Sequence, residues 1–220
     1  MNRRRCLARI AIASFLMLGG AGGTALPGEE PSRPSLSPSP PKPSPVSVEV
    51  LGTVDAVNDP AGLLDESVVV GSDISVLYEI RPDASPDPAS QPNMADYLGA
   101  IRPGDIQLKV GRYSFREHPE RVQVTMVDGG TNAEGLFDGW YVYAPNPGTR
   151  LLGARHDLTI FLSLFDGTAQ ALGSTALVPV PSLEAWSEAR IGVSRTVTTA
   201  SATREEQFIA GKITSIRVVH

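Results

Sequence analysis

Four side chains with oxygen atoms lie close together in one glycine-rich segment of the chain. They are Asp128, Asn132, Glu134 and Asp138. Ca²⁺ prefers several carboxylate and carbonyl oxygens, which an acidic, glycine-rich loop supplies, although the spacing here does not match an EF-hand loop. Asp and Asn are also ordinary turn residues, because their side chains accept hydrogen bonds from nearby backbone amides. A calcium site and plain turn chemistry are therefore both open interpretations of this segment.

Two tyrosines, Tyr141 and Tyr143, follow Trp140 in a run that alternates in polarity. In a strand, successive side chains point to opposite faces, so the tyrosines share the face opposite Trp140. An exposed pair of tyrosines can stack on sugar rings, which makes both residues candidates for ligand binding. The alternative is that Trp140 and Val142 fill the core while the tyrosines only cover a face of the sheet.

Groups that carry nucleophilic or acid–base catalysis are scarce. The three histidines, His118, His156 and His220, lie in polar turns or at strand ends, where a solvated side chain is the simplest interpretation. Neither a Gly-x-Ser-x-Gly elbow nor a His-Glu-x-x-His helix occurs in the sequence. The only cysteine is Cys6, near the start of the chain. We therefore expect no catalytic residues, no cofactor and no enzymatic activity.

The elements that would position these side chains are short strands. Apolar residues alternate with polar ones in many segments, and turn residues such as Asp128-Gly129-Gly130 separate them. Only residues 182–189 suit a helix, and a short one. We predict an all-β domain over residues 46–220, an antiparallel β-sandwich of the jelly-roll or Ig-like kind. The expected strands are 46–54, 68–70, 74–80, 106–115, 122–127, 140–143, 158–165, 191–198 and 208–219.

The first and last strands of this domain both contain glycine, Gly52 and Gly211. Glycine inside a strand often marks a bulge or a close approach of another backbone. Loose terminal strands would expose apolar edges to aggregation. We therefore expect these two strands to be partners or near neighbours in the core.

The N-terminal region predicts export. Residues 1–25 have a basic start, an apolar run and a stretch of small residues, which is the order of a secretory signal peptide. Residues 26–45 are rich in proline and serine and predict a disordered, extended linker. We expect a periplasmic or extracellular protein with no membrane-spanning segment after cleavage. The sequence leaves open the general secretory or the twin-arginine route, and whether the signal is cleaved or retained.

The charge of the chain favours some partners over others. The sequence has 19 Lys and Arg against 24 Asp and Glu, a net charge of −5. Loss of residues 1–25 removes four arginines and no acid, so 15 basic residues remain against 24 acids and the net charge falls to −9. An acidic surface repels phosphate backbones and anionic lipids, so we expect no nucleic-acid partner.

Several short motifs resemble a known bacterial exported domain. They include Gly52-Thr53-Val54-Asp55-Ala56-Val57-Asn58-Asp59-Pro60, the segment 162–169 and the closing Gly211-Lys212-Ile213-Thr214. The chain resembles, over residues 47–218, the uncharacterised β-sandwich domain found in proteins with a PEP-CTERM sorting signal. The resemblance implies a β-sandwich without established catalytic residues. Tyr78-Glu79 stands where that family has Tyr-Asp, and the printed sequence lacks the sorting anchor.

These observations lead to three functional hypotheses. The first is an exported, non-enzymatic β-sandwich with a structural or binding role in the bacterial envelope or extracellular matrix, its partner a glycan or another envelope component. The second is a carbohydrate- or calcium-binding module. The third is a hydrolase that uses unrecognised carboxylates, which would require two of them to face each other in a cleft.

Overall fold

The computed structural model describes residues 42–116, 122–151, 154–198 and 203–220. These residues belong to one compact unit, 41–220. The predicted signal peptide, most of the predicted linker and His118 lie outside the described residues. The first strand begins at Val46.

The described residues form ten strands and one short 3-10 helix. Their bounds are β1 (Val46–Val57), β2 (Asp73–Ile80), β3 (Met94–Tyr97), β4 (Ile101–Val110), β5 (Tyr113–Arg116), β6 (Gln123–Asn132), β7 (Gly135–Leu151), β8 (Ala154–Asp166), η1 (Leu183–Ala185), β9 (Glu188–Thr198) and β10 (Thr203–Val218). The prediction of an all-β fold with one short helix is confirmed.

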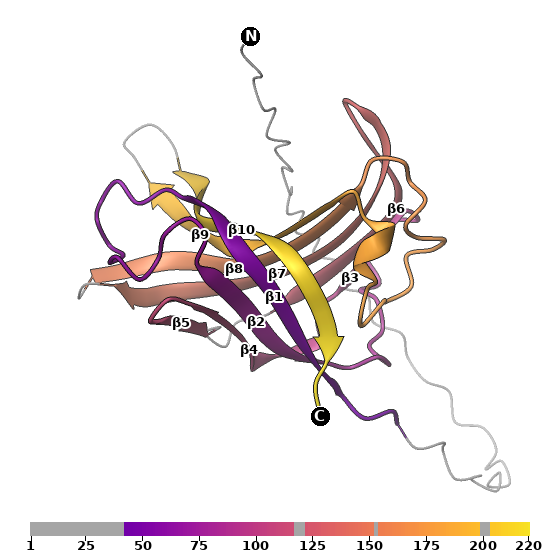
Figure 1. Ribbon diagram of the computed structural model, residues 1–220. Coiled ribbons are helices and arrows are strands. Elements are labelled where there is room, and N and C mark those ends of the chain that lie inside the picture. Colours follow the sequence, from indigo (N-terminus) through magenta and orange to yellow (C-terminus); the bar gives the residue numbers. More distant parts are fainter. Residues whose placement is uncertain (1–41, 117–121, 152–153, 199–202) are drawn as a thin grey trace, which may run out of the picture. The chain divides into compact units, whose positions relative to one another are not determined.

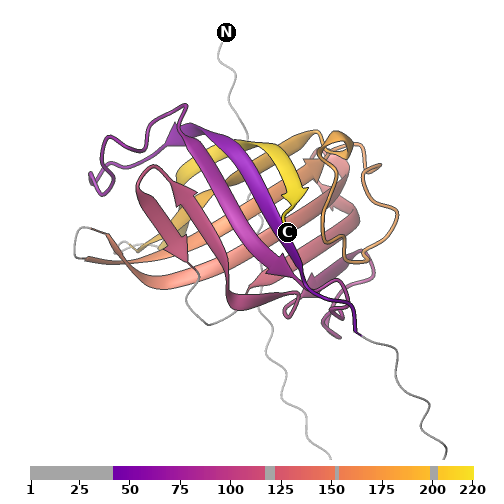
Figure 2. The same ribbon diagram turned by 60° about the horizontal axis from the view of Figure 1, so that its bottom comes forward.

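All ten strands belong to one antiparallel sheet with the spatial order β3-β6-β7-β8-β9-β10-β1-β2-β4-β5. The sheet curls into a half-barrel, so that β1, β2, β4 and β5 face β6, β7 and β8 across a shared interior (Figures 1 and 2). Since curling brings two halves of one sheet face to face, the domain is sandwich-like, as the alternating sequence pattern predicts.

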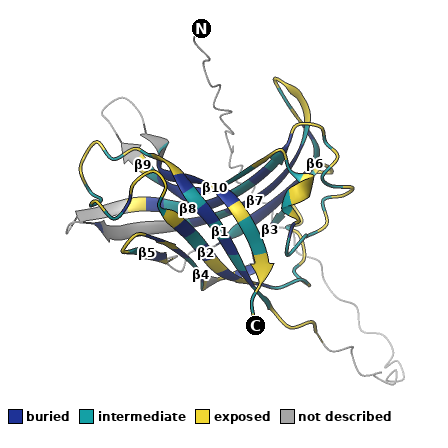
Figure 3. Cartoon of the chain, viewed as in Figure 1, coloured by how far each residue is buried: buried dark blue, intermediate teal, exposed yellow. Residues whose placement is uncertain are grey.

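Alternation along the strands separates an inner face from an outer face. The inner side chains are almost fully buried, among them Val48 and Val50 of β1, Trp140 and Val142 of β7, and Leu162 of β8. Figure 3 shows these buried positions recurring along the strands, whereas the connecting loops are mostly exposed. The inner face is therefore the core of the domain.

The first and last strands lie next to each other in the middle of the sheet, which confirms the prediction from their glycines. β1 pairs with β10 from Val48 opposite Val218 to Val57 opposite Ile209, with irregularities at Leu51/Gly52 and Val54/Ala56. A Cβ at Gly52 would lie 2.6 Å from the Lys212 carbonyl oxygen. A side chain at this position would push the two backbones apart, so glycine is required there.

Strand β3 forms one edge of the sheet, although β2 and β4, which precede and follow it in the sequence, lie near the other edge. The chain leaves β2 at Ile80, pairs β3 with β6 at the far edge, and returns to β4 beside β2. The exposed side of β3 is not left open, because the Asp87 amide donates to the Asp96 carbonyl at 2.7 Å. The Asp96 amide in turn donates to Ser90 Oγ at 3.1 Å. These bonds block further strand pairing at this edge.

Residues 167–187, which we call the strap, connect β8 to β9 at the end of the sheet where β3 lies (Figure 1). Several of its apolar side chains pack against the core: Leu172, Leu177, Val178, Val180, Leu183 and Trp186. Trp140 Nε1 donates to the Val178 carbonyl at 3.0 Å, and Tyr97 Oη donates to the Thr175 carbonyl at 2.8 Å. The strap thus packs over Tyr97 of β3 and Trp140 of β7.

The structure corrects four expected segments. Residues 68–70 form a turn rather than a strand, since Val68 is buried but Val69 and Val70 are exposed. The segment 106–115 is a hairpin of β4 and β5, in which Gly111 has a φ of 54° at the turn. The helix expected over 182–189 is only the single turn Leu183–Ala185, because β9 begins at Glu188. β3 itself is a strand in a segment that is absent from the expected strands.

Candidate functional site

An irregularity in β4 opens a pocket on the outer face of the sheet. Tyr78 of β2 pairs with Ile106, but Ile80 pairs with Ile101, so Glu79 alone lies opposite the four β4 residues 102–105. Gly104 adopts a φ of 86°, which favours glycine at this turn in the strand. Bulges of this kind re-aim side chains and are common beside functional sites.

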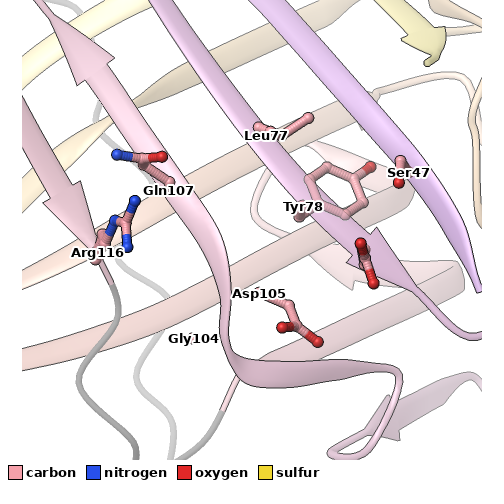
Figure 4. Close-up of a pocket in the computed structure, with 8 residues that line it drawn as sticks. Ser47, Leu77, Tyr78, Gly104, Asp105, Gln107 and Arg116 are labelled. Atoms are coloured by element: carbon pink, nitrogen blue, oxygen red, sulfur yellow. The ribbon is translucent and has the colours of Figure 1, made fainter. Parts of the chain in front are cut away.

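The pocket has a volume of about 230 Å³ and draws its walls from four strands (Figure 4). It is lined by Ser47 of β1, Leu77, Tyr78 and Glu79 of β2, Gly104, Asp105 and Gln107 of β4, and Arg116 of β5. Strand alternation places Ser47, Leu77, Glu79 and Gln107 on the outer face, because the residues between them face the core. Leu77 is 48% exposed and gives the pocket an apolar wall. We call this the β4-bulge pocket.

The charged groups of the β4-bulge pocket are Glu79, Asp105 and Arg116. Within the part of the chain that the structure describes, no hydrogen bond or ion pair engages the side chains of Glu79, Asp105 or Arg116. Gln107 donates from Nε2 to Ser114 Oγ, which leaves its carbonyl oxygen to accept. The pocket therefore presents two carboxylates, one guanidinium and one amide oxygen with unused hydrogen-bonding capacity.

Several acidic side chains elsewhere in the domain have partners. On the outer face, Asp55 pairs with Arg190 at 2.5 Å and Glu49 with Arg217 at 2.5 Å. Asp65 pairs with Arg112 and also accepts from Ser67, and hydrogen bonding from Ser67 is the largest cause of its lowered pKa. The β4-bulge pocket instead gathers charges of both signs in one place.

Beneath the pocket, Tyr78 adds a second unsatisfied group. Its side chain is fully buried, and its hydroxyl has no hydrogen-bond partner among the residues that the structure describes. Burial raises the pKa of Tyr78 well above its usual value, because the interior disfavours the phenolate. The hydroxyl is therefore protonated and remains a neutral donor.

Two of the four candidate calcium residues accept hydrogen bonds from backbone amides. Asp138 is fully buried, and its two oxygens accept from the Gly129 amide at 2.9 Å and the Leu172 amide at 2.8 Å. Asn132 Oδ1 accepts from the amides of Glu134 and Gly135, which is ordinary turn chemistry. Asp128 is half-buried and Glu134 is exposed. Among the described residues, no three acidic, histidine or cysteine side chains are placed to hold a metal ion.

Sequence reasoning missed the partner of Asp138. Asp166, which the sequence pattern did not single out, lies directly opposite Asp138 in the β7–β8 pair. Its Oδ2 accepts from the Gln170 amide at 2.9 Å and from Thr168 Oγ1 at 2.7 Å, and its Oδ1 from the Thr168 amide at 3.1 Å. These bonds stabilise the charged form and lower the pKa of Asp166, with the Gln170 amide as the largest cause. The two aspartates thus hold the first residues of the strap, 168–172.

The two candidate tyrosines lie on the outer face, opposite Trp140, as alternation predicts. Tyr141 is only 6% exposed, and its ring lies over Gly139, where a Cβ would be 2.3 Å from the ring. Burial, followed by the nearby Tyr143 and Glu188, raises the pKa of Tyr141 to about 12. Trp140 and Val142 fill the core. Tyr141 therefore covers the sheet, and only the half-buried Tyr143 keeps part of its ring accessible.

Of the three histidines, the structure describes the side chain of His220 alone. His220 is exposed at the C-terminus, while only the backbone of His156 is described. No helix among the described residues has the length and apolarity needed to cross a bilayer. No protein-family model, curated protein or solved structure matches the chain.

Proposed function

We propose that this chain is an exported, non-enzymatic β-domain that acts by binding in the bacterial envelope or extracellular matrix. The observation that carries the proposal is the contrast between its carboxylates. The buried Asp138 and Asp166 are bonded to backbone amides of the loops they hold, whereas Glu79 and Asp105 lie unpaired in an outer pocket. Groups with unused capacity on a rigid sheet favour recognition of a ligand.

Export rests on the sequence order of residues 1–25 and has its own test. The full chain should be produced in a bacterial host with an intact secretory system, and the recovered protein should be sequenced from its N-terminus. We expect the recovered protein to begin close to Leu26. Recovery of the full-length chain from the cytoplasm alone would contradict the proposal.

A carbohydrate-binding role is the second candidate, and one cluster on the outer face favours it. Thr125 Oγ1 donates to Asp96 Oδ1 at 2.6 Å, and Gln123 Nε2 donates to the same oxygen at 2.9 Å. Tyr143 lies directly opposite Gln123 on the neighbouring strand. An aromatic ring beside a fixed carboxylate and amide suits a sugar ring with its hydroxyl groups.

A glycan array, run with and without calcium, tests this second role. Binding of neutral glycans that is lost in Tyr143→Ala and kept in Tyr113→Phe would support it. Binding that requires calcium would instead support the calcium-dependent form of the module. An array without a signal under either condition would remove both forms.

A further inference from the structure

Resting on the proposed binding function, we propose that the β4-bulge pocket binds a small zwitterion that carries an ammonium group at one end and a carboxylate at the other. Free amino acids and the ends of short peptides have this chemistry. The proposal deepens the function by naming the ligand class. It depends on four side chains from four strands: Ser47, Glu79, Asp105 and Arg116.

The pocket separates its charges by sign. In Figure 4, Arg116 and Gln107 lie on one side and Asp105 lies on the other, toward Ser47. The pairing of β1 with β2 places Glu79 directly beside Ser47, hence on the acidic side. Gln107 pairs with both Leu77 and Arg116. The basic side therefore lies level with Leu77, two residues along β2 from Glu79.

No ion pair joins the two sides of the pocket in the described structure. Arg116 lies two strands away from β2 and level with Leu77, which is two residues from Glu79. The backbones of Arg116 and Glu79 are therefore roughly 12 Å apart. A ligand with both charges can bridge this gap, with its ammonium at the carboxylates and its carboxylate at the guanidinium.

The alternatives with a single charge fit less well. A simple anion would meet Arg116 but also two carboxylates, which repel it. A divalent cation would find two carboxylates but also a guanidinium that repels it, and no three acidic, histidine or cysteine side chains of the described residues are placed to hold a metal ion. A ligand that carries both charges satisfies all three groups at once.

The size and walls of the pocket limit the ligand further. Pockets for drug-sized ligands range from about 300 to 1,000 Å³. The β4-bulge pocket, at about 230 Å³, is smaller and suits a compact molecule. Leu77 supplies an apolar wall between the two charged sides, so a short aliphatic spacer between the ligand's charges would lie against it.

The test uses the full chain, labelled with ¹⁵N, and titrations with γ-aminobutyrate and glycylglycine followed by amide chemical shifts. We expect millimolar or tighter binding, with shifts confined to β2, β4, β5 and the start of β1. Butyrate and butylammonium carry one charge each and should bind at least tenfold more weakly. Calcium chloride should leave these resonances in place.

Matched variants connect binding to the pocket. Glu79→Gln and Arg116→Gln should each weaken binding of γ-aminobutyrate about tenfold or more, because each removes one charged hydrogen bond. Glu66→Gln and Lys109→Gln remove the same charges at exposed positions outside the pocket and should leave binding unchanged. Melting temperatures of all four variants report whether the fold is retained.

Three results would overturn the inference. They are no shift up to 50 mM zwitterion, equal binding of butyrate or butylammonium, and shifts in this pocket with calcium alone. Each leaves the proposed function standing if the protein is exported and binds a glycan elsewhere. Cytoplasmic retention of the chain would instead remove the proposed function, even with zwitterion binding intact.

Discussion

Two pairs of carboxylates lie on neighbouring strands of this sheet, one on its inner face and one on its outer face. Asp138 and Asp166 are directly opposite each other on β7 and β8, and both are buried. Glu79 and Asp105 lie on β2 and β4, where the β4 irregularity opens the outer pocket. Both pairs concentrate negative charge, yet only the inner pair has hydrogen-bond donors.

Structural acids differ from ligand-binding acids in whether the protein itself supplies donors to their oxygens. A buried carboxylate without donors would be strongly unfavourable, so the inner pair persists because strap and loop amides satisfy its oxygens. The outer pair is hydrated and needs no protein partner. Substitutions at the inner pair should therefore change stability, and substitutions at the outer pair should change binding.

The largest effect is expected for Asp138→Ala. The change leaves the amides of Gly129 and Leu172 without their acceptor, and each such loss costs about 1–3 kcal/mol. We expect the free energy of unfolding to fall by roughly 2–4 kcal/mol in urea titrations. Asp128→Ala removes a neighbouring carboxylate that has no side-chain partner among the described residues, and it should change the free energy of unfolding by less than about 0.5 kcal/mol. Equal losses in the free energy of unfolding for the two variants would show that the hydrogen bonds of Asp138 do not stabilise the fold.

A smaller loss of stability is expected for Trp140→Phe. The change removes the donor to the Val178 carbonyl and leaves a void in the core beneath the strap. We expect a loss of roughly 1–3 kcal/mol in the free energy of unfolding. Hydrogen exchange should quicken at Leu172, whose amide binds Asp138, more than at Val76 on β2. Uniform exchange across the sheet would show that the strap and the sheet unfold as one unit.

The contribution of Asp166 should depend on pH. Its pKa is lowered in the folded chain, because strap donors stabilise the charged form. Its stabilising effect is thus complete above the unfolded pKa of about 4 and is lost as the pH falls through the lower folded value. Urea unfolding of the wild type and Asp166→Asn should differ most at pH 6 and least at pH 2.5. Thr168→Ala, which removes one donor, should narrow that difference.

The strands were largely predictable from the sequence because one face of each is buried. Alternation along 46–54 and 74–80 predicts β1 and β2, and the glycines of the terminal strands predict the β1–β10 pair. β3 was missed because its four residues lie in a loop rich in proline and acids, too short for a period to emerge. A strand at Val68–Val70 was wrongly predicted, because an apolar run without alternation fits a turn with one buried residue equally well.

The candidate sites were less predictable, since their geometry depends on residues far apart in the sequence. Asp138 was singled out as a possible calcium ligand, but the Leu172 amide on the strap occupies one of its oxygens. The β4-bulge pocket combines residues from four strands, and no spacing in the sequence relates Ser47 to Arg116. Only the pairing of β1, β2, β4 and β5 brings them together.

The smallest effect on the free energy of unfolding is expected at the outer pair, Glu79 and Asp105. Glu79→Gln and Asp105→Asn keep the size of each side chain and remove a charge that has no partner in the described structure. Substitutions on exposed surfaces usually change stability by no more than about 0.5 kcal/mol. Two negative charges beside each other repel weakly in water, so we expect both variants to match or slightly exceed the stability of the wild type. Urea titrations at low and high salt check this, because salt screens the repulsion and should erase any gain. A loss above about 1 kcal/mol in either variant would mean that the outer carboxylates also hold the fold together.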